Sequence, residues 1–83
     1  MELIFSRKAF RQLCRLERKV QQRINGKLNF YLSQKEPLAF AERIMDSRFG
    51  EWRFRIGDYR VLFDVNRDTI EVLKVDHRGD IYK

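Results

Sequence analysis

The sequence predicts an α+β fold in which an antiparallel-dominated sheet of about four strands carries an N-terminal pair of helices on one face. A short β-prone run opens the chain, two stretches with helical apolar spacing follow, and strand-like segments fill the second half. Because the helical stretches precede the run of strands instead of alternating with it, the strands should pair with one another beneath both helices. We expect residues 1–83 to form one domain.

The first half of the chain is predicted to be a strand followed by two helices. Leu3-Ile4-Phe5 has the composition of a strand, and Ser6 is a suitable N-cap for the helix after it. The first helix should bury a stripe made of Ala9, Phe10, Leu13, Cys14 and Leu16. The second should bury Val20, Ile24, Leu28, Tyr31 and Leu32. We expect the two helices to pack antiparallel, with a tight joint near Leu16-Glu17, and Pro37 to end the second near Gln34-Lys35.

The second half is predicted to be a short helical turn over residues 38–45, a loop over 46–50 and three strands. Gly57-Asp58 has the composition of a two-residue type II′ turn, with glycine in its first position, so residues 52–63 should form a hairpin. The last strand should run from Thr69 to about Asp76. Its apolar residues change phase, which a β-bulge near Leu73-Lys74 explains, as does a strand covered on both faces.

Apolar and basic residues alternate along the hairpin, so one face should be core and the other should carry guanidinium groups. The core set is Trp52, Phe54, Ile56, Tyr59, Val61, Phe63 and Val65. The face left open should carry Arg53, Arg55, Arg60, Leu62 and Asp64. The turn places Arg55 opposite Arg60, and like charges facing each other across a sheet are destabilising by roughly 0.2–1 kcal/mol. Such a cluster suits a phosphate ligand, although a solvated face paired with Glu51 and Asp64 is the structural alternative.

The composition indicates a basic globular protein with an anionic partner. Eighteen Lys and Arg against 12 Asp and Glu give a net charge of +6, which is typical of nucleic-acid binding but is also compatible with a merely basic surface. The one cysteine, Cys14, is expected to be a core thiol in a reducing cytoplasm. We expect no signal peptide, no membrane association and, with His77 the only histidine, no metal site or cofactor.

Two segments of the chain resemble the RelE family of type II toxin–antitoxin toxins. Residues 55–63, RIGDYRVLF, resemble the family's hairpin, and residues 75–82, VDHRGDIY, resemble its C-terminal signature of a strand, a basic pair and a tyrosine. The resemblance covers nearly the whole chain. It implies a RelE-like fold, similar to that of microbial ribonucleases, and a toxin that acts as a ribosome-dependent mRNA interferase. Such an endoribonuclease cleaves message in the A site by metal-independent attack of the 2′-hydroxyl, and thereby inhibits translation.

The resemblance also implies partners and site residues. The partners are a cognate acidic, RelB-like antitoxin and mRNA on the ribosome, with operator DNA bound only indirectly through the antitoxin. The catalytic candidates are Arg53, Arg55, Arg60, Arg78, Tyr82 and His77. The arginines would hold phosphate oxygens, with Arg78 toward the leaving group, and Tyr82 would stack on a base or orient the 2′-hydroxyl. His77 has a suitable pKa for acid–base work, but a histidine hydrogen-bonded at a strand end remains the alternative.

Two other functions remain open on this sequence. One is a ParE-like inhibitor of DNA gyrase that has the same fold and cleaves nothing. The other is a catalytically lapsed toxin that acts as an antitoxin-bound co-repressor. In the family, gyrase inhibitors generally lack the complete basic set at positions 53, 55, 60 and 78 together with Tyr82, so the arginines favour the ribonuclease.

Overall fold

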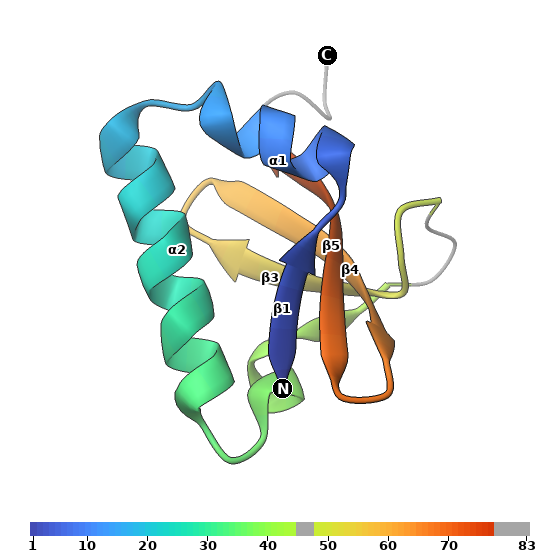
Figure 1. Ribbon diagram of the computed structural model, residues 1–83. Helices are drawn as coiled ribbons and strands as arrows, with labels where there is room; N and C mark the ends of the chain where they lie inside the picture. The colour runs from blue at the N-terminus through green and yellow to red at the C-terminus, as the bar shows by residue number, and fades with distance from the viewer. Residues whose placement is uncertain (45–47, 78–83) are drawn as a thin grey trace.

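The computed structural model describes residues 1–44 and 48–77, which form a five-stranded sheet with two helices against it (Figure 1). In chain order the elements are β1 (Glu2–Phe5), α1 (Arg7–Cys14), α2 (Arg18–Ser33), the 3₁₀ helix η1 (Pro37–Phe40), β2 (Glu42–Arg43), β3 (Trp52–Ile56), β4 (Tyr59–Asn66) and β5 (Thr69–His77). The predicted α+β class is therefore confirmed.

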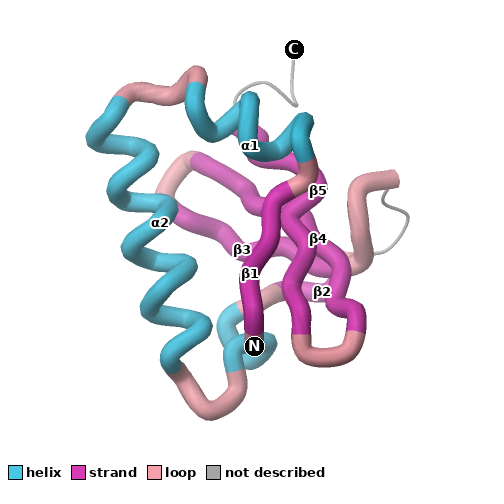
Figure 2. The backbone as a smooth tube through the Cα atoms, viewed as in Figure 1, coloured by secondary structure: helices cyan, strands magenta, loops and turns pink. Residues whose placement is uncertain are grey.

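The strands lie in the order β1-β5-β4-β3-β2, and every neighbouring pair is antiparallel except β1 with β5. The expected count of about four strands missed β2, a two-residue strand on the edge beside β3 (Figure 2). The helical turn expected over residues 38–45 is shorter, because only Pro37–Phe40 are helical. Two residues are too few to show an alternating pattern, so β2 exists because β3 offers it an edge.

The expected N-cap and the expected bulge are both present. The Ser6 hydroxyl accepts a hydrogen bond from the Ala9 amide at 3.1 Å, which satisfies one of the free N–H groups at the start of α1. In the β4–β5 ladder Leu62 pairs with Lys74 and Phe63 with Val72, so Leu73 is the extra residue of a bulge. The bulge lets Val72 and Val75 face the same core although an odd number of positions separates them along the strand.

The helices do not form the expected antiparallel pair. The chain turns between Cys14 and Arg18, as expected, but α1 lies crosswise to α2 and packs mainly on β5, while α2 packs on β3 and η1 (Figure 1). Only Ala9 and Leu13 of α1 are buried, so the prediction of a wider stripe was wrong, and Phe10 is 56% exposed. Cys14 is also exposed, which corrects its assignment to the core.

The core lies between the helices and one face of the sheet. Its fully buried members are Phe54, Phe63, Ile24, Leu28, Ile56, Ile70, Val61 and Val72. Tyr31 of α2 stacks on Phe54, and Phe54 stacks on Phe63, with ring centroids 4.7 and 4.6 Å apart. Helix α2 ends at Ser33, as Pro37 predicted. Neither α1 nor α2, the helices in the described part of the chain, is long and apolar enough to cross a bilayer.

Candidate functional site

The sheet face opposite the helices, called the open face below, carries the predicted arginines. Arg53 and Arg55 lie on β3, and Arg60 lies directly across from Arg55 on β4, as the turn predicted. Gly57 has φ +59° and is the only one of the two turn residues with a positive φ, which fits the expected II′ turn. The core side of the same strands carries Phe54, Ile56, Val61 and Phe63, all buried, so the alternation holds through the whole hairpin.

Glu42 on the edge strand β2 holds two of these arginines in place. It lies opposite Arg53 in the β2–β3 ladder. Its carboxylate forms ion pairs with Arg53, whose Nη2 lies at 3.0 Å, and with Arg55, whose Nε lies at 3.1 Å. One anion thereby offsets the repulsion between two cations on the same strand. The alternative in which Glu51 and Asp64 neutralise the arginines is wrong. The Glu51 carboxylate forms an ion pair with Arg43, and the Asp64 carboxylate accepts a hydrogen bond from the Glu51 amide.

Glu42 is also the described carboxyl whose pKa departs clearly from its ordinary value. The hydrogen bond from Arg53 is the largest cause and lowers the pKa of Glu42 below its usual 4.5; desolvation opposes it, and the charges of Arg53 and Arg55 add smaller effects in the lowering direction. Glu42 is therefore ionised at neutral pH. An anionic ligand at Arg53 or Arg55 would share these guanidinium groups with Glu42.

Arg60 is a cation with unsatisfied hydrogen-bonding capacity. Its Nε is buried and has no hydrogen-bond partner within residues 1–44 and 48–77, and the same is true of Arg53 Nε. Asp76 lies opposite Arg60 on β5 but forms its ion pair with Lys74, at 3.5 Å. Leaving a buried guanidinium N–H without a hydrogen bond costs free energy, so binding of an anion by Arg60 would be favourable.

The open face is basic at one end and acidic at the other. The arginines lie toward the β3–β4 turn, whereas Asp64 and Glu71 lie opposite each other at the far end, close to Glu51. Leu62 and Lys74 form a pair between the two ends. A polyanion such as a nucleic-acid backbone would be attracted to the basic end and repelled from the acidic end. It would therefore cross the strands near the turn instead of following them along the whole sheet.

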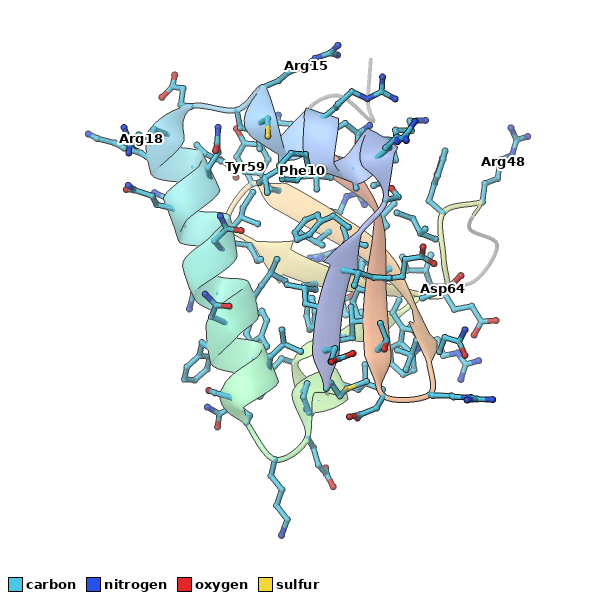
Figure 3. The ribbon with its side chains drawn as sticks, viewed as in Figure 1. Phe10, Arg15, Arg18, Arg48, Tyr59 and Asp64 are labelled. Atoms are coloured by element: carbon cyan, nitrogen blue, oxygen red, sulfur yellow. The ribbon has the colours of Figure 1, made fainter. Side chains whose placement is uncertain are left out.

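His77 does not join the arginines. In the β4–β5 ladder it pairs with Tyr59, and their rings are in edge contact with centroids 4.9 Å apart. Tyr59 packs against the core and lies on the helix side of the sheet, opposite to the side of Asp64 (Figure 3). His77 therefore leaves the sheet on the side away from Arg60. The other two catalytic candidates, Arg78 and Tyr82, lie outside the described residues.

Comparisons with known proteins agree with this fold. A family model described as the ParE toxin of type II toxin–antitoxin systems, parDE, matches residues 3–82. The chain belongs to this toxin family. Toxin RelG of Mycobacterium tuberculosis is 35% identical over 51 residues, which make up 59% of this chain and 59% of RelG. The match thus spans less than two thirds of that relative.

Two solved toxin–antitoxin complexes contain chains with this fold. The first is RelBE2 of Mycobacterium tuberculosis, with a TM-score of 0.79 and 28% identity over 95% of this chain and 92% of that one. The second is the RelB–RelE complex of Methanococcus jannaschii, with a TM-score of 0.70 and 25% identity over 96% of this chain and 95% of that one. The chain is a member of the RelE/ParE superfamily of toxins, as the resemblance of its hairpin and C-terminal segment predicted.

Three residues at the open face of the toxin were missed from the sequence. Glu42 lies in a strand too short to be recognised, so its pairing with Arg53 was invisible. Lys74 follows the bulge, which reverses the side on which the next residues lie. Phe49 precedes a glycine in a loop, a position that carries no periodic signal. For Lys74, the bulge predicted from the apolar phase was the signal that would have placed it on the open face.

Proposed function

We propose that this toxin is an mRNA interferase, an endoribonuclease that cleaves message in the ribosomal A site. The observation that carries the proposal is Arg60, a cation without an anionic partner in the described chain, lying beside Arg53 and Arg55 on an uncovered sheet face. Three guanidinium groups on one small surface match the geometry and charge of a phosphodiester. The resemblance of residues 55–63 and 75–82 to the RelE family supports the same activity, and the likeness to toxin RelG and to the toxins of two RelB–RelE-type complexes is in line with that family.

The chemistry needs no metal. The ribose 2′-hydroxyl attacks the adjacent phosphorus in line with the leaving 5′ oxygen, and negative charge builds up on the phosphorane oxygens. Arg55 and Arg60 are assigned to these oxygens, and Arg53 to a flanking phosphate. Arginine stays protonated and is a poor proton acceptor. Glu42, which contacts Arg53 and Arg55, is the carboxylate to which we assign the 2′ proton; its lowered pKa makes it a weak base, in keeping with slow cleavage of free RNA.

His77 is not given an acid–base role, because the sheet separates it from the arginines. Arg78 is assigned to the leaving group and Tyr82 to base stacking or to orienting the 2′-hydroxyl, both on the strength of the family resemblance. These two assignments require the segment after β5 to approach the open face.

The ribosome is proposed to supply the positioning that this small surface lacks. Three arginines contact phosphate, which fixes the register of an RNA but reads no sequence. We therefore expect slow cleavage of free RNA. For regulation, we infer a cognate acidic, RelB-like antitoxin, because the solved relatives are toxin–antitoxin complexes and this chain carries a net charge of +6. Operator DNA would be reached only through that antitoxin.

Arg60→Ala tests the proposal. In a translating extract we expect the wild-type toxin to produce codon-phased breaks in message, mapped by primer extension, and the Arg60→Ala toxin to produce none. Loss of the main phosphate contact removes transition-state stabilisation worth roughly 100- to 1,000-fold in rate. Arg18→Ala is the matched control, because Arg18 is an exposed arginine that projects outward from α2, far from the open face (Figure 3). Equal cleavage by both variants would contradict the proposal.

Inhibition of DNA gyrase by binding is the second candidate. The match to the ParE toxin family model over residues 3–82 is the observation in its favour. It predicts intact message, arrested replication and toxicity that survives Arg60→Ala. The same extract, assayed for message breaks and for gyrase supercoiling activity, separates the two functions.

A further inference from the structure

The loop before β3 places an aromatic ring between two ammonium groups at the margin of the open face. Phe49 lies 4.8 Å from Lys8 Nζ of α1 and 4.4 Å from Lys74 Nζ of β5, measured to the ring centroid. Phe49 is partly exposed, and Lys8 is exposed. Three segments distant in the sequence therefore meet at one ring. We propose that Phe49, Lys8 and Lys74 form a platform that binds a nucleobase of the RNA held by the arginines.

The loop is held in place by Gly50. This glycine has φ +104°, and a Cβ at this position would lie 2.4 Å from the carbonyl oxygen of Phe63 in β4. Only glycine allows such a close backbone approach together with a positive φ. The Glu51 amide, which donates to the Asp64 carboxylate at 2.9 Å, ties the next residue to β4 as well. Phe49 therefore directly precedes two residues whose backbones are fixed against β4.

Phe49 is not a core residue. The buried aromatic rings Phe54 and Phe63 lie on the helix side of the sheet, whereas Lys74 pairs with Leu62 on the open face. A phenylalanine kept against two lysine ammonium groups on the open face is well suited to a ligand that offers both a π-face and negative charge. A nucleotide has both, and stacking of bases on aromatic side chains next to basic groups is how single-stranded nucleic acids are bound without sequence readout.

The spacing suits one RNA strand. Arg53, Leu62 and Lys74 lie in one row across β3, β4 and β5, so Lys74 is two strand spacings, roughly 10 Å, from Arg53. A strand with one phosphate at the arginines can reach Phe49 with the base of a nearby nucleotide. On binding, the base takes the place of one ammonium over the ring, and Lys8, on an exposed helical turn, is free to move to that nucleotide's phosphate. The ligand in this inference is RNA, and so it rests on the proposed function.

The test is binding of short 2′-O-methyl RNA oligonucleotides, which lack the attacking hydroxyl, to the full-length toxin at millimolar concentration, followed by NMR. A second oligonucleotide has the same phosphates but an abasic central residue. We expect the Phe49 ring protons to shift with the base-bearing oligonucleotide and not with the abasic one. Phe49→Leu, which keeps apolar volume but has no ring, should weaken binding of the base-bearing oligonucleotide by roughly 5- to 150-fold. Phe49→Tyr should bind as the wild type does.

The outcomes separate the platform from the proposed function. If Arg60→Ala weakens both oligonucleotides and Phe49→Leu weakens neither, the platform is wrong and the phosphate site stands. If the abasic oligonucleotide shifts the Phe49 ring equally, Lys8 and Lys74 bind phosphate and the ring binds no base, which also overturns the platform. If neither oligonucleotide binds the wild type at millimolar concentration, the platform is wrong, whereas the proposed function is decided by message breaks in the translating extract. A hexaglutamate peptide that reproduces the shift would indicate an acidic protein partner and overturn the platform.

Discussion

Glu42 and Arg60 set the charge balance of the arginine cluster. Two cations on β3 share the Glu42 carboxylate, and the third, on β4, has a buried Nε without a partner in residues 1–44 and 48–77. The cluster therefore has an internal anion on one side and spare donors on the other. A phosphate that binds Arg60 also meets Glu42, which competes for Arg53 and Arg55. Affinity for an anion at this face should depend on the charge of Glu42.

Glu42→Gln tests the charge of Glu42 and its ion pairs with Arg53 and Arg55 through the pH dependence of stability. The folded-state pKa of Glu42 is lowered by Arg53 and Arg55, so its ion pairs stabilise the fold above its unfolded pKa, near 4.5, and this contribution is lost as the pH falls through the lower folded value. We expect the wild type to be the more stable protein at pH 7 and the difference in free energy of unfolding to disappear in acid, as measured by urea denaturation from pH 3 to 7. A difference that stays constant over this range would exclude the ion pairs as its cause.

At this scale the sequence predicted the arginines well. The turn chemistry of Gly57 and the alternation on both strands were sufficient to place Arg53, Arg55 and Arg60 on one face. Grouping His77 with them from the sequence was less secure, because the side of a strand on which a residue near its end lies depends on every bulge before it. The bulge at Leu73 lies before His77 and sets its side, together with that of Tyr59, away from Arg60.

Among the elements, α1 shows how a helix can continue a sheet edge. Strand β1 pairs with β5 only as far as Val72, so the amide of Val75 lies beyond it. The side-chain oxygen of Gln12 on α1 accepts a hydrogen bond from the Val75 amide at 2.8 Å. The Ser6 amide donates a hydrogen bond to the Val72 carbonyl, also at 2.8 Å. The helix thereby satisfies backbone groups that β1 leaves free. This role sets α1 crosswise to α2 and leaves Phe10 and Cys14 exposed.

Two glycines in different elements should respond oppositely to alanine. Gly26 lies in the exposed interior of α2, where a methyl group would have no other atom within 4 Å, so Gly26→Ala should stabilise the fold by about 0.5–1 kcal/mol. Gly50→Ala should destabilise it by about 2–4 kcal/mol, because it combines an unfavourable φ with a clash against the β4 backbone. Urea titrations of the two variants measure both values. A stabilised Gly50→Ala protein would disprove the close approach of the loop to β4.

The charge distribution matters at the scale of the whole molecule. The net charge of +6 is carried partly by the outer helix surface, where Arg15 and Arg18 project from the junction of the two helices, and partly by the open face (Figure 3). The first set can attract any polyanion. The second set brings three guanidinium groups together on one sheet face, and we assign phosphate binding to it and long-range attraction to both sets.

Salt dependence of RNA binding distinguishes the two sets. Each phosphate contact to a single strand contributes about 0.7 to the slope of log affinity against log salt concentration. We expect Arg60→Ala to reduce the slope by about that amount, and Phe49→Leu to lower affinity with no change in slope, because stacking releases no counterions. Filter-binding titrations of a 2′-O-methyl oligonucleotide from about 50 to 300 mM salt provide the measurement. An unchanged slope for Arg60→Ala would mean that Arg60 contacts no phosphate.

The amino-acid sequence by itself determined the order of elements, the hairpin and its open face of arginines, because helix periodicity, strand alternation, an N-cap serine and a Gly-Asp turn are all local properties. Tertiary structure decided the rest. The crosswise setting of α1, the edge strand β2 that carries Glu42 and the position of the Phe49 loop follow from which backbone groups the sheet leaves unpaired and from one close approach at Gly50. The contacts that are shown, of Glu42 with Arg53 and Arg55 and of Phe49 with Lys8 and Lys74, join distant segments, and no local pattern encodes them.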